Sequence, residues 1–205
     1  MKENDLIFEV HYYILDFTEH KSRILKKYQE ALDQKLVDTD MIEINHTINK
    51  LPEYVTTSSC TGRITIISKT KLRSKYNTVF HLKTHNPNEF SKYHYENLQN
   101  IDFDGELWLL VESPNVHIRC HNLENAENLH QIALQSKLSK SKFQSISPAI
   151  VVEILGTGSI QVPLGSDGKI LISKDHFRFV VIKSVELLHA EQKRLFAFHK
   201  SLLSE

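Results

Sequence analysis

Hydroxyls, a thiol, a glycine and an arginine fill eight consecutive positions of this sequence, Thr56 to Arg63. The stretch follows a helix-ending proline, Pro52, and precedes an apolar run, Ile64–Ile67, which favours a loop. Hydroxyl and backbone donors beside a flexible glycine and the forked cation of Arg63 suit an anion or a polar small molecule. The stretch is therefore a candidate binding site, to which its residues alone assign no reaction.

Basic residues gather in two stretches without an acid, although the whole chain carries 25 basic and 25 acidic residues. Such segregation indicates a surface for phosphate groups; the alternative is a pair of solvated faces. We expect these stretches to contact nucleic acid through Lys69, Lys71, Arg73, Lys75, Lys137, Lys140 and Lys142.

Histidines and cysteines offer other chemistry, most of which their spacing argues against. His81 and His85 are four positions apart, as are His117 and His121, but on strands this separation is roughly 13 Å. Neither pair can therefore share one metal ion, and we expect no metal site. Cys60 with His85 or His117 as its base would make a thiol enzyme, which stays open as an alternative.

Two further patterns fail to meet the requirements of known motifs. Ser58 and Ser59 lack the Gly-x-Ser-x-Gly surroundings of a hydrolase nucleophile. Gly156–Gly158 follows a strand-like run, but the next residues do not read as a helix and a third glycine is missing. We interpret Gly156–Gly158 as a hairpin turn.

Hydrophobic periodicity predicts helices interspersed with strands. Residues 6–15 fit a strand or a helical turn, and Asp16 with Glu19 indicates a helix start. Further helices are expected over about 17–35, from Asp38 to Pro52, from Asn86–Pro87 through Leu98, after Asn122 and after Ser173. Strands are expected at 64–67, 79–82, 106–112, 116–120, 149–155, 160–164 and 169–172.

Tight turns between adjacent strands favour an α+β fold over a doubly wound one. We expect a mixed, mostly antiparallel sheet with flanking helices and a long C-terminal helix, in one compact domain over 1–205. Sub-halves of about 1–104 and 105–205 are the alternative division.

The composition is that of a soluble globular protein, with 40% hydrophobic and 24% charged residues. The 2 cysteines are too few for a secreted disulfide scaffold, and neither a signal peptide nor a run of roughly 18 apolar residues is visible. We expect a cytoplasmic protein that does not contact membranes, with a monomer favoured.

One longer pattern resembles a known family. Asp38 and the run Ile48–Ile64 resemble the signature of the tRNA wybutosine-synthesizing protein 3 family, in a stand-alone form of the archaeal type. Later matches follow in order at Phe80–His85, Glu106–Glu112, His117–Cys120 and Val162–Gly168, so that the resemblance covers about 17–195. Two departures are Phe80, where the family usually has tryptophan, and the loss of the family's glycines at 137–142.

This resemblance implies an S-adenosyl-L-methionine-dependent methyltransferase that acts on a tricyclic base beside the anticodon of tRNA-Phe, in wybutosine biosynthesis. For such a reaction we expect His85 or His117 to be the proton acceptor, and we expect cofactor or substrate binding by Thr57, Ser58, Ser59, Cys60, Gly62, Arg63, Glu112 and Arg119. The two basic stretches would contact the anticodon loop. A non-catalytic RNA-binding module and a hydrolase that uses Cys60 are the alternatives.

Overall fold

The computed structural model describes residues 3–70 and 78–203, of which residues 3–16 are described by their backbone alone. The chain divides into two compact units, each assembled from separate segments. Unit 1 contains the chain up to Cys60, Asn115–Leu155 and the end from Ala197, and unit 2 contains Thr61–Pro114 and Gly156–Phe196. The prediction of a single domain stays a prediction.

Unit 1 is built on a four-stranded antiparallel sheet in the order β1-β5-β7-β6. Its strands are β1 (Tyr54–Cys60), β5 (Asn115–Cys120), β6 (Lys142–Ser145) and β7 (Ile150–Leu155). Its helices are α1 (Glu3–Asp33), α2 (Met41–Lys50) and α5 (Leu123–Gln135). Met41, Ile44 and Ile48 recur on one face of α2 and are buried, as the helical period requires.

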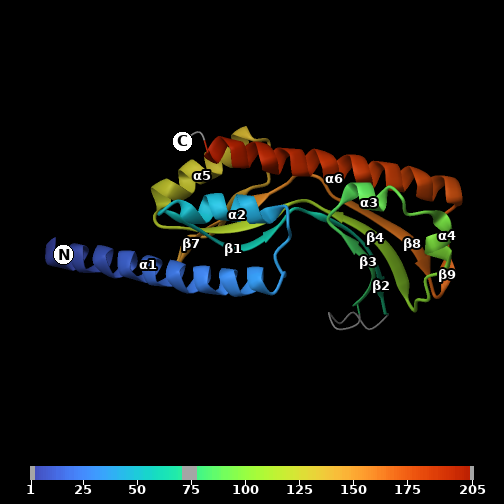
Figure 1. Ribbon diagram of the computed structural model, residues 1–205, viewed down its shortest axis with the longest axis horizontal. Helices are drawn as coiled ribbons and strands as arrows, with labels where there is room; N and C mark the ends of the chain where they lie inside the picture. Colours follow the sequence, from blue (N-terminus) through green and yellow to red (C-terminus); the bar gives the residue numbers. More distant parts are fainter. Residues whose placement is uncertain (1–2, 71–77, 204–205) are drawn as a thin grey trace. The chain divides into compact units, whose positions relative to one another are not determined.

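Unit 2 is built on a five-stranded antiparallel sheet in the order β3-β2-β4-β8-β9. Its strands are β2 (Arg63–Lys69), β3 (Thr78–Thr84), β4 (Glu106–Glu112), β8 (Ile160–Ser166) and β9 (Lys169–Ile170). Its helices are α3 (Pro87–Phe90), α4 (Tyr95–Gln99) and most of α6 (Lys174–Leu202), and they lie on one side of this sheet (Figure 1).

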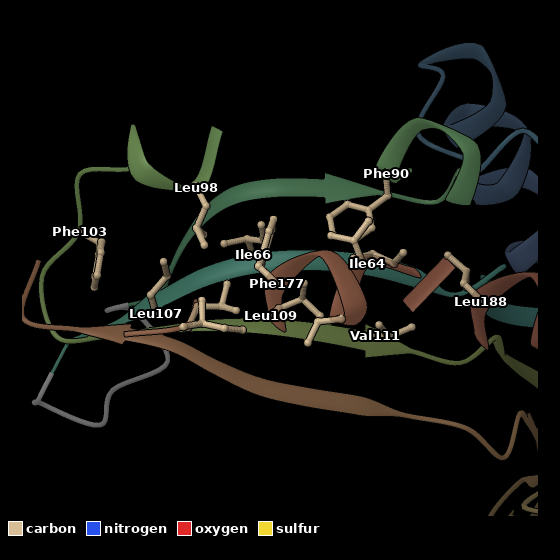
Figure 2. Close-up of a cluster of buried hydrophobic side chains, with 14 residues drawn as sticks. Ile64, Ile66, Phe90, Leu98, Phe103, Leu107, Leu109, Val111, Phe177 and Leu188 are labelled. Atoms are coloured by element: carbon tan, nitrogen blue, oxygen red, sulfur yellow. The ribbon is translucent and has the colours of Figure 1, made fainter. Parts of the chain in front are cut away.

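The hydrophobic core of unit 2 fills the space between this sheet and its helices. Alternate strand residues point into it, among them Ile64 and Ile66 of β2 and Leu109 of β4, and Phe177 of α6 packs over them (Figure 2). The period of two along a strand sends the intervening residues to the opposite side of the sheet.

The α+β class, the antiparallel pairing and the long C-terminal helix are confirmed, although the strands form two sheets instead of one. Asn122 caps α5 as predicted, because its side chain accepts a hydrogen bond of 2.8 Å from the Asn125 amide. None of the described helices has the length and apolar character needed to cross a membrane.

Four local predictions are wrong. Helix α1 runs through Asp16, so that this residue does not start a helix, and residues 6–15 are helical. Residues 86–98 form two short helices instead of one, and Thr56–Cys60 is a strand instead of a loop. Gly156–Gly158 links β7 to β8, which belong to different sheets, so that it is not a hairpin turn.

Candidate functional site

A β-bulge divides the hydroxyls of β1 between the two faces of the unit 1 sheet. Thr56 lies opposite Ile118, whereas Ser58 lies opposite His117 and Ser59 opposite Val116, with the register shift at Thr57. Directly opposed residues share a face, so that Thr56 and Ser59 lie on the face of the buried Ile118 and Val116. Ser58 lies on the other face, beside His117. Without the bulge, Thr56 and Ser59 would point in opposite directions.

Two buried asparagines on successive turns of α2 hold this strand. The Oδ1 atom of Asn49 accepts hydrogen bonds from the amide of Thr56 at 2.8 Å and from its hydroxyl at 3.0 Å. The Nδ2 group of Asn45 donates to the Ser59 hydroxyl at 2.9 Å. Asn45 is only 1% exposed, and its Oδ1 atom has no hydrogen-bond partner among the described residues.

A cavity of about 470 Å³ lies beside the free edge of β1, within unit 1. Burial in its wall raises the pKa of Tyr28. A carboxylate oxygen of Asp38, another wall residue, lies within 4.8 Å of the Cys60 thiol sulfur. The wall comprises His20, Ile24, Lys27, Tyr28, Ala31, Leu36, Val37, Asp38, Asn45, Thr56, Thr57, Ser58 and Ser59.

On the other face, four polar side chains form a row across the whole unit 1 sheet. Ser58 of β1 is opposite His117 of β5, His117 is opposite Glu153 of β7, and Glu153 is opposite Lys142 of β6. The Nε2 atom of His117 lies 3.4 Å from Glu153 Oε1, and Lys142 Nζ lies 3.1 Å from Glu153 Oε2. Asn115 also donates to Glu153 at 2.9 Å.

Glu153 is buried yet remains ionised because of these three donors. Burial raises the pKa of its carboxyl group, but hydrogen bonds from Lys142, Asn115 and His117 outweigh that effect and lower the pKa overall. The carboxylate can only accept, so the Nε2 atom of His117 donates to Glu153, and the neutral form of the ring has its lone pair at Nδ1. This tautomer gives unit 1 a proton acceptor.

The other predicted residues of the signature lie in unit 2. Gly62 has φ +87°, and a Cβ there would lie 2.7 Å from the Glu112 carbonyl oxygen, so that the turn before β2 requires glycine. The His85 ring donates from Nδ1 to the Gly62 carbonyl at 2.8 Å. Arg63 forms an ion pair with Glu112, its opposite residue on β4.

The predicted site residues therefore divide between the units. Ser58, Ser59 and His117 are in unit 1 with Thr57, Cys60 and Arg119, whereas Gly62, Arg63, His85 and Glu112 are in unit 2. The guanidinium of Arg119 is buried 5.8 Å from the centre of the Phe17 ring. Cys120 is the more buried cysteine, and burial raises the pKa of its thiol to about 12.

The predicted RNA-contacting lysines have different surroundings. Lys69 ends β2, Lys137 and Lys140 are exposed between α5 and β6, and Lys142 is engaged with Glu153. Lys71, Arg73 and Lys75 lie outside the described residues.

Sequence reasoning missed Asn45, Asn49 and Glu153. The asparagines are four positions apart on a predicted helix, and this spacing places them on one face. Glu153 was visible as a single acid inside an apolar strand run, which in a buried strand requires partners. These two signals were available, but neither identifies the groups that the side chains contact.

The Gly156–Gly158 turn binds a carboxylate of its own chain. Glu191 of α6, only 1% exposed, accepts from the amides of Thr157 and Gly158, each at 3.0 Å, and from the Thr157 hydroxyl at 3.1 Å. Arg194 pairs with the same carboxylate. The amides that a dinucleotide phosphate would need are therefore occupied by Glu191.

Comparison with known proteins identifies the family. The family described as Methyltransferase TYW3 matches residues 19–204. A Pyrococcus abyssi protein named tRNA(Phe) 7-((3-amino-3-carboxypropyl)-4-demethylwyosine(37)-N(4))-methyltransferase 2 is 37% identical over 83% of this chain and 82% of its own length. A Thermococcus sibiricus methyltransferase of the same specificity in name is 33% identical over 88% of this chain and 92% of its own.

A solved structure agrees with these sequence relatives. The PH1069 protein from Pyrococcus horikoshii superposes with a TM-score of 0.86 and 28% identity, over 93% of this chain and 97% of that chain. The resemblance inferred from the signature is thus confirmed by the family match and by the sequence relatives. The chain belongs to the TYW3 methyltransferase family.

Proposed function

We propose that this protein is an S-adenosylmethionine-dependent methyltransferase acting on N4 of the tricyclic wyosine-type base beside the anticodon of tRNA-Phe. The observation that carries the proposal is the family membership, with relatives named for this reaction at 37% and 33% identity over most of the chain. The residues Thr56, Thr57, Ser58 and Ser59 of the family signature lie on β1, along the wall of the unit 1 cavity. The tRNA substrate implies action in the cytoplasm, and a monomer is favoured.

The unit 1 cavity fits the cofactor in size and in chemistry. Its volume of about 470 Å³ lies within the roughly 300–1,000 Å³ common for small-molecule sites. Asn45 offers a buried acceptor, its Oδ1 atom, that has no partner among the described side chains. Buried polar groups ordinarily have a partner, so this atom marks a place for a ligand donor, such as a ribose hydroxyl or an amino group. Tyr28 adds an aromatic surface and Asp38 a carboxylate that suits a cation.

The cofactor, when bound, supplies a methyl carbon attached to a positively charged sulfur, which accepts the electrons of the breaking bond. The chain's own residues then have two tasks, which are to hold the base and to remove its proton. In our proposal His117 takes the N4 proton at Nδ1 while Glu153 stabilises the resulting imidazolium through Nε2. The Ser58 hydroxyl, opposite His117, hydrogen-bonds the base.

His85 is the second candidate for the proton acceptor, because its Nδ1 atom donates to Gly62 and its Nε2 atom keeps the lone pair. We favour His117 because its ring contacts the buried carboxylate of Glu153. Arg63 is paired with Glu112. In this proposal it contributes to binding indirectly, by holding the turn at Gly62 in place.

The proposal is tested with labelled S-adenosylmethionine and tRNA-Phe that carries the unmethylated tricyclic base. We expect one methyl group per tRNA, located at N4 by mass spectrometry of the released nucleoside. Calorimetric titration of the cofactor, with and without this tRNA, measures binding independently of turnover. Absence of cofactor binding in both titrations would exclude the proposed function.

A further inference from the structure

The sheet of unit 2 has one face covered by helices and one face without them. Helices α3, α4 and α6 all contribute side chains to the core against Ile64, Ile66 and Leu109, and therefore lie on the same side (Figure 2). Residues that alternate with these three point to the other side. In the described part of unit 2, that face is formed by the strands β3, β2, β4, β8 and β9, and we call it the helix-free face.

Apolar side chains form a row across this helix-free face. Phe80 is opposite Ile67, Ile67 is opposite Trp108, and Trp108 is opposite Pro163, so that the four share one side of four neighbouring strands. Phe80 is 55% exposed and Pro163 is exposed, while Trp108 is partly exposed. Phe80 and Trp108 are two strands apart, which is roughly 10 Å. The exposed Phe80 ring and the partly exposed Trp108 ring, on either side of the buried Ile67, indicate a binding surface instead of a core.

Trp108 is oriented by polar neighbours and borders a hollow. Its indole nitrogen donates to Glu106 Oε2 at 3.0 Å, and the Lys69 ammonium lies 5.7 Å from the centre of its ring. Trp108 also lines a cavity of about 400 Å³, whose wall includes Pro163, Leu171 and His176 of α6. A flat apolar molecule can therefore enter beside the indole ring.

Positive charge accompanies the aromatic row. Thr65, Ile67 and Lys69 alternate along β2 and therefore share this face. Lys83 of β3 is exposed and lies opposite Thr65, so that it is on the same face. Among the described residues, neither lysine forms an ion pair with a carboxylate, whereas Arg63 on the same face is paired with Glu112. Aromatic faces flanked by cations are complementary to unpaired nucleotides, whose bases stack and whose phosphates are anionic.

We propose that this helix-free face binds unpaired nucleotides of the tRNA substrate, with bases stacked on Phe80 and Trp108 and phosphates against Lys69 and Lys83. The inference rests on the proposed function for the identity of the RNA, and it assigns that RNA to a surface outside the cofactor cavity of unit 1. Stacking tolerates any base, so this face supplies affinity for the loop and leaves recognition of the modified base to other residues.

Trp108 is the only tryptophan of the chain, and its fluorescence reports directly on the proposed surface. We would titrate the protein with an anticodon stem–loop RNA and with a blunt RNA duplex of equal length. Stacking predicts quenching by the stem–loop and little quenching by the duplex, whose bases are paired. The Phe80→Ala variant keeps the reporter and should bind the stem–loop about 5- to 100-fold more weakly.

Val79→Ala is the matched control, because Val79 is 52% exposed on the same strand but alternates to the other side. It should bind RNA like the parent protein. Lys83→Ala should lower the slope of log K against log salt by about 0.7, whereas Lys183→Ala on α6 should not.

Three outcomes would overturn the inference: no quenching by the stem–loop, equal affinities for the Phe80→Ala and Val79→Ala variants, or burial of Trp108 by protein dimers seen in sedimentation. Methyl transfer measured in parallel separates the two proposals. Intact methylation without quenching rejects the stacking surface alone. Quenching with no cofactor binding rejects the methyltransferase function and leaves an RNA-binding face.

Discussion

The two sheets of this protein differ in the cross-strand row of side chains that each carries, which is polar in unit 1 and apolar in unit 2. In unit 1, the row Ser58–His117–Glu153–Lys142 carries a buried carboxylate that three neighbouring side chains satisfy. In unit 2, the corresponding row is apolar, and Phe80 at its end is 55% exposed. A satisfied polar row fixes the position of an imidazole, whereas the exposed Phe80 ring faces solvent. This difference is the basis of our two proposals, which place the chemistry in unit 1 and RNA binding in unit 2.

The largest expected effect comes from removing the His117 imidazole of unit 1, which tests whether catalysis and RNA binding depend on different units. The His117→Ala variant should lose about 10²- to 10⁴-fold in kcat, because a positioned general base contributes on this scale. Its affinity for the anticodon stem–loop should be unchanged. Single-turnover methyl transfer and fluorescence titration measure the two quantities separately.

His189→Ala is the control, since His189 is exposed on α6 and its ring contacts Asn88 at 3.2 Å. An equal loss of kcat in both variants, or an unaltered kcat in His117→Ala, would contradict the assignment of the proton acceptor to His117.

The next largest effect concerns the turn where the chain passes from unit 1 into unit 2. Gly62→Ala forces a Cβ to within 2.7 Å of the Glu112 carbonyl oxygen at φ +87°. We expect the free energy of unfolding to fall by about 2 kcal/mol or more, since backbone must shift and the left-handed region costs roughly 1–2 kcal/mol.

Urea denaturation followed by circular dichroism measures this loss. Gly168→Ala is the matched control, because Gly168 has φ +73° but its nearest neighbour to an added Cβ is 3.7 Å away. The two variants should share the cost of the conformation and differ by the steric overlap. Equal losses would show that the close approach at Gly62 has no energetic weight.

A smaller effect tests whether the cofactor binds in the unit 1 cavity, as we propose. Asn45→Ala removes the buried Oδ1 acceptor and the hydrogen bond to Ser59, so cofactor affinity should fall by about 1–2 kcal/mol, or roughly 5- to 30-fold. Calorimetric titration measures the dissociation constant.

Asn49→Ala tests whether any change in α2 has the same consequence, because Asn49 binds the Thr56 backbone instead of lining the cavity. It should destabilise the fold and leave cofactor affinity in the folded protein nearly intact. If Asn45→Ala binds S-adenosylmethionine as tightly as the parent protein, the cofactor lies elsewhere.

The smallest effect concerns the pH dependence of stability. The Glu153 carboxyl group has a lowered pKa in the folded protein, so its contribution to stability is fully present above the unfolded value of about 4.3 and is lost as pH falls through the folded pKa. The parent protein should therefore lose on the order of 1 kcal/mol of stability from this group as the pH falls below about 4.3, and the Glu153→Gln variant should not show this loss.

Thermal unfolding from pH 3 to 7 measures this slope for both proteins. In the same samples, ¹⁵N chemical shifts of the His117 ring should show loss of the preference for the Nε2–H tautomer in Glu153→Gln. Unchanged ring shifts would contradict a positioning role for Glu153.

Most elements could be predicted because their residues follow simple periods. The helical spacing of Met41, Ile44 and Ile48 predicts α2 and its buried face. The run Glu106–Glu112 predicts β4, and Asn122 predicts the start of α5. The Thr56–Cys60 strand was missed because hydroxyl residues signal loops as often as strands, and here pairing with β5 decides the outcome.

The candidate site was predicted less completely. The signature named Ser58, Ser59 and His117 but could not distinguish their faces, because these depend on the bulge at Thr57. The prediction of a hairpin turn at Gly156–Gly158 was wrong for a similar reason. A hairpin and a passage between sheets use the same turn residues, and the contact with Glu191, more than 30 positions later, distinguishes them.

The family, the α+β class and the buried faces of the helices could be predicted from the amino-acid sequence, because each depends on residue order or on a local period. Strand pairing in three dimensions places the strands in two sheets, brings Glu153 into contact with His117 and puts Phe80 and Trp108 on one helix-free face. These features depend on strand register, which pairs residues tens of positions apart. A shift of one residue moves every side chain to the opposite face, and no local pattern records it.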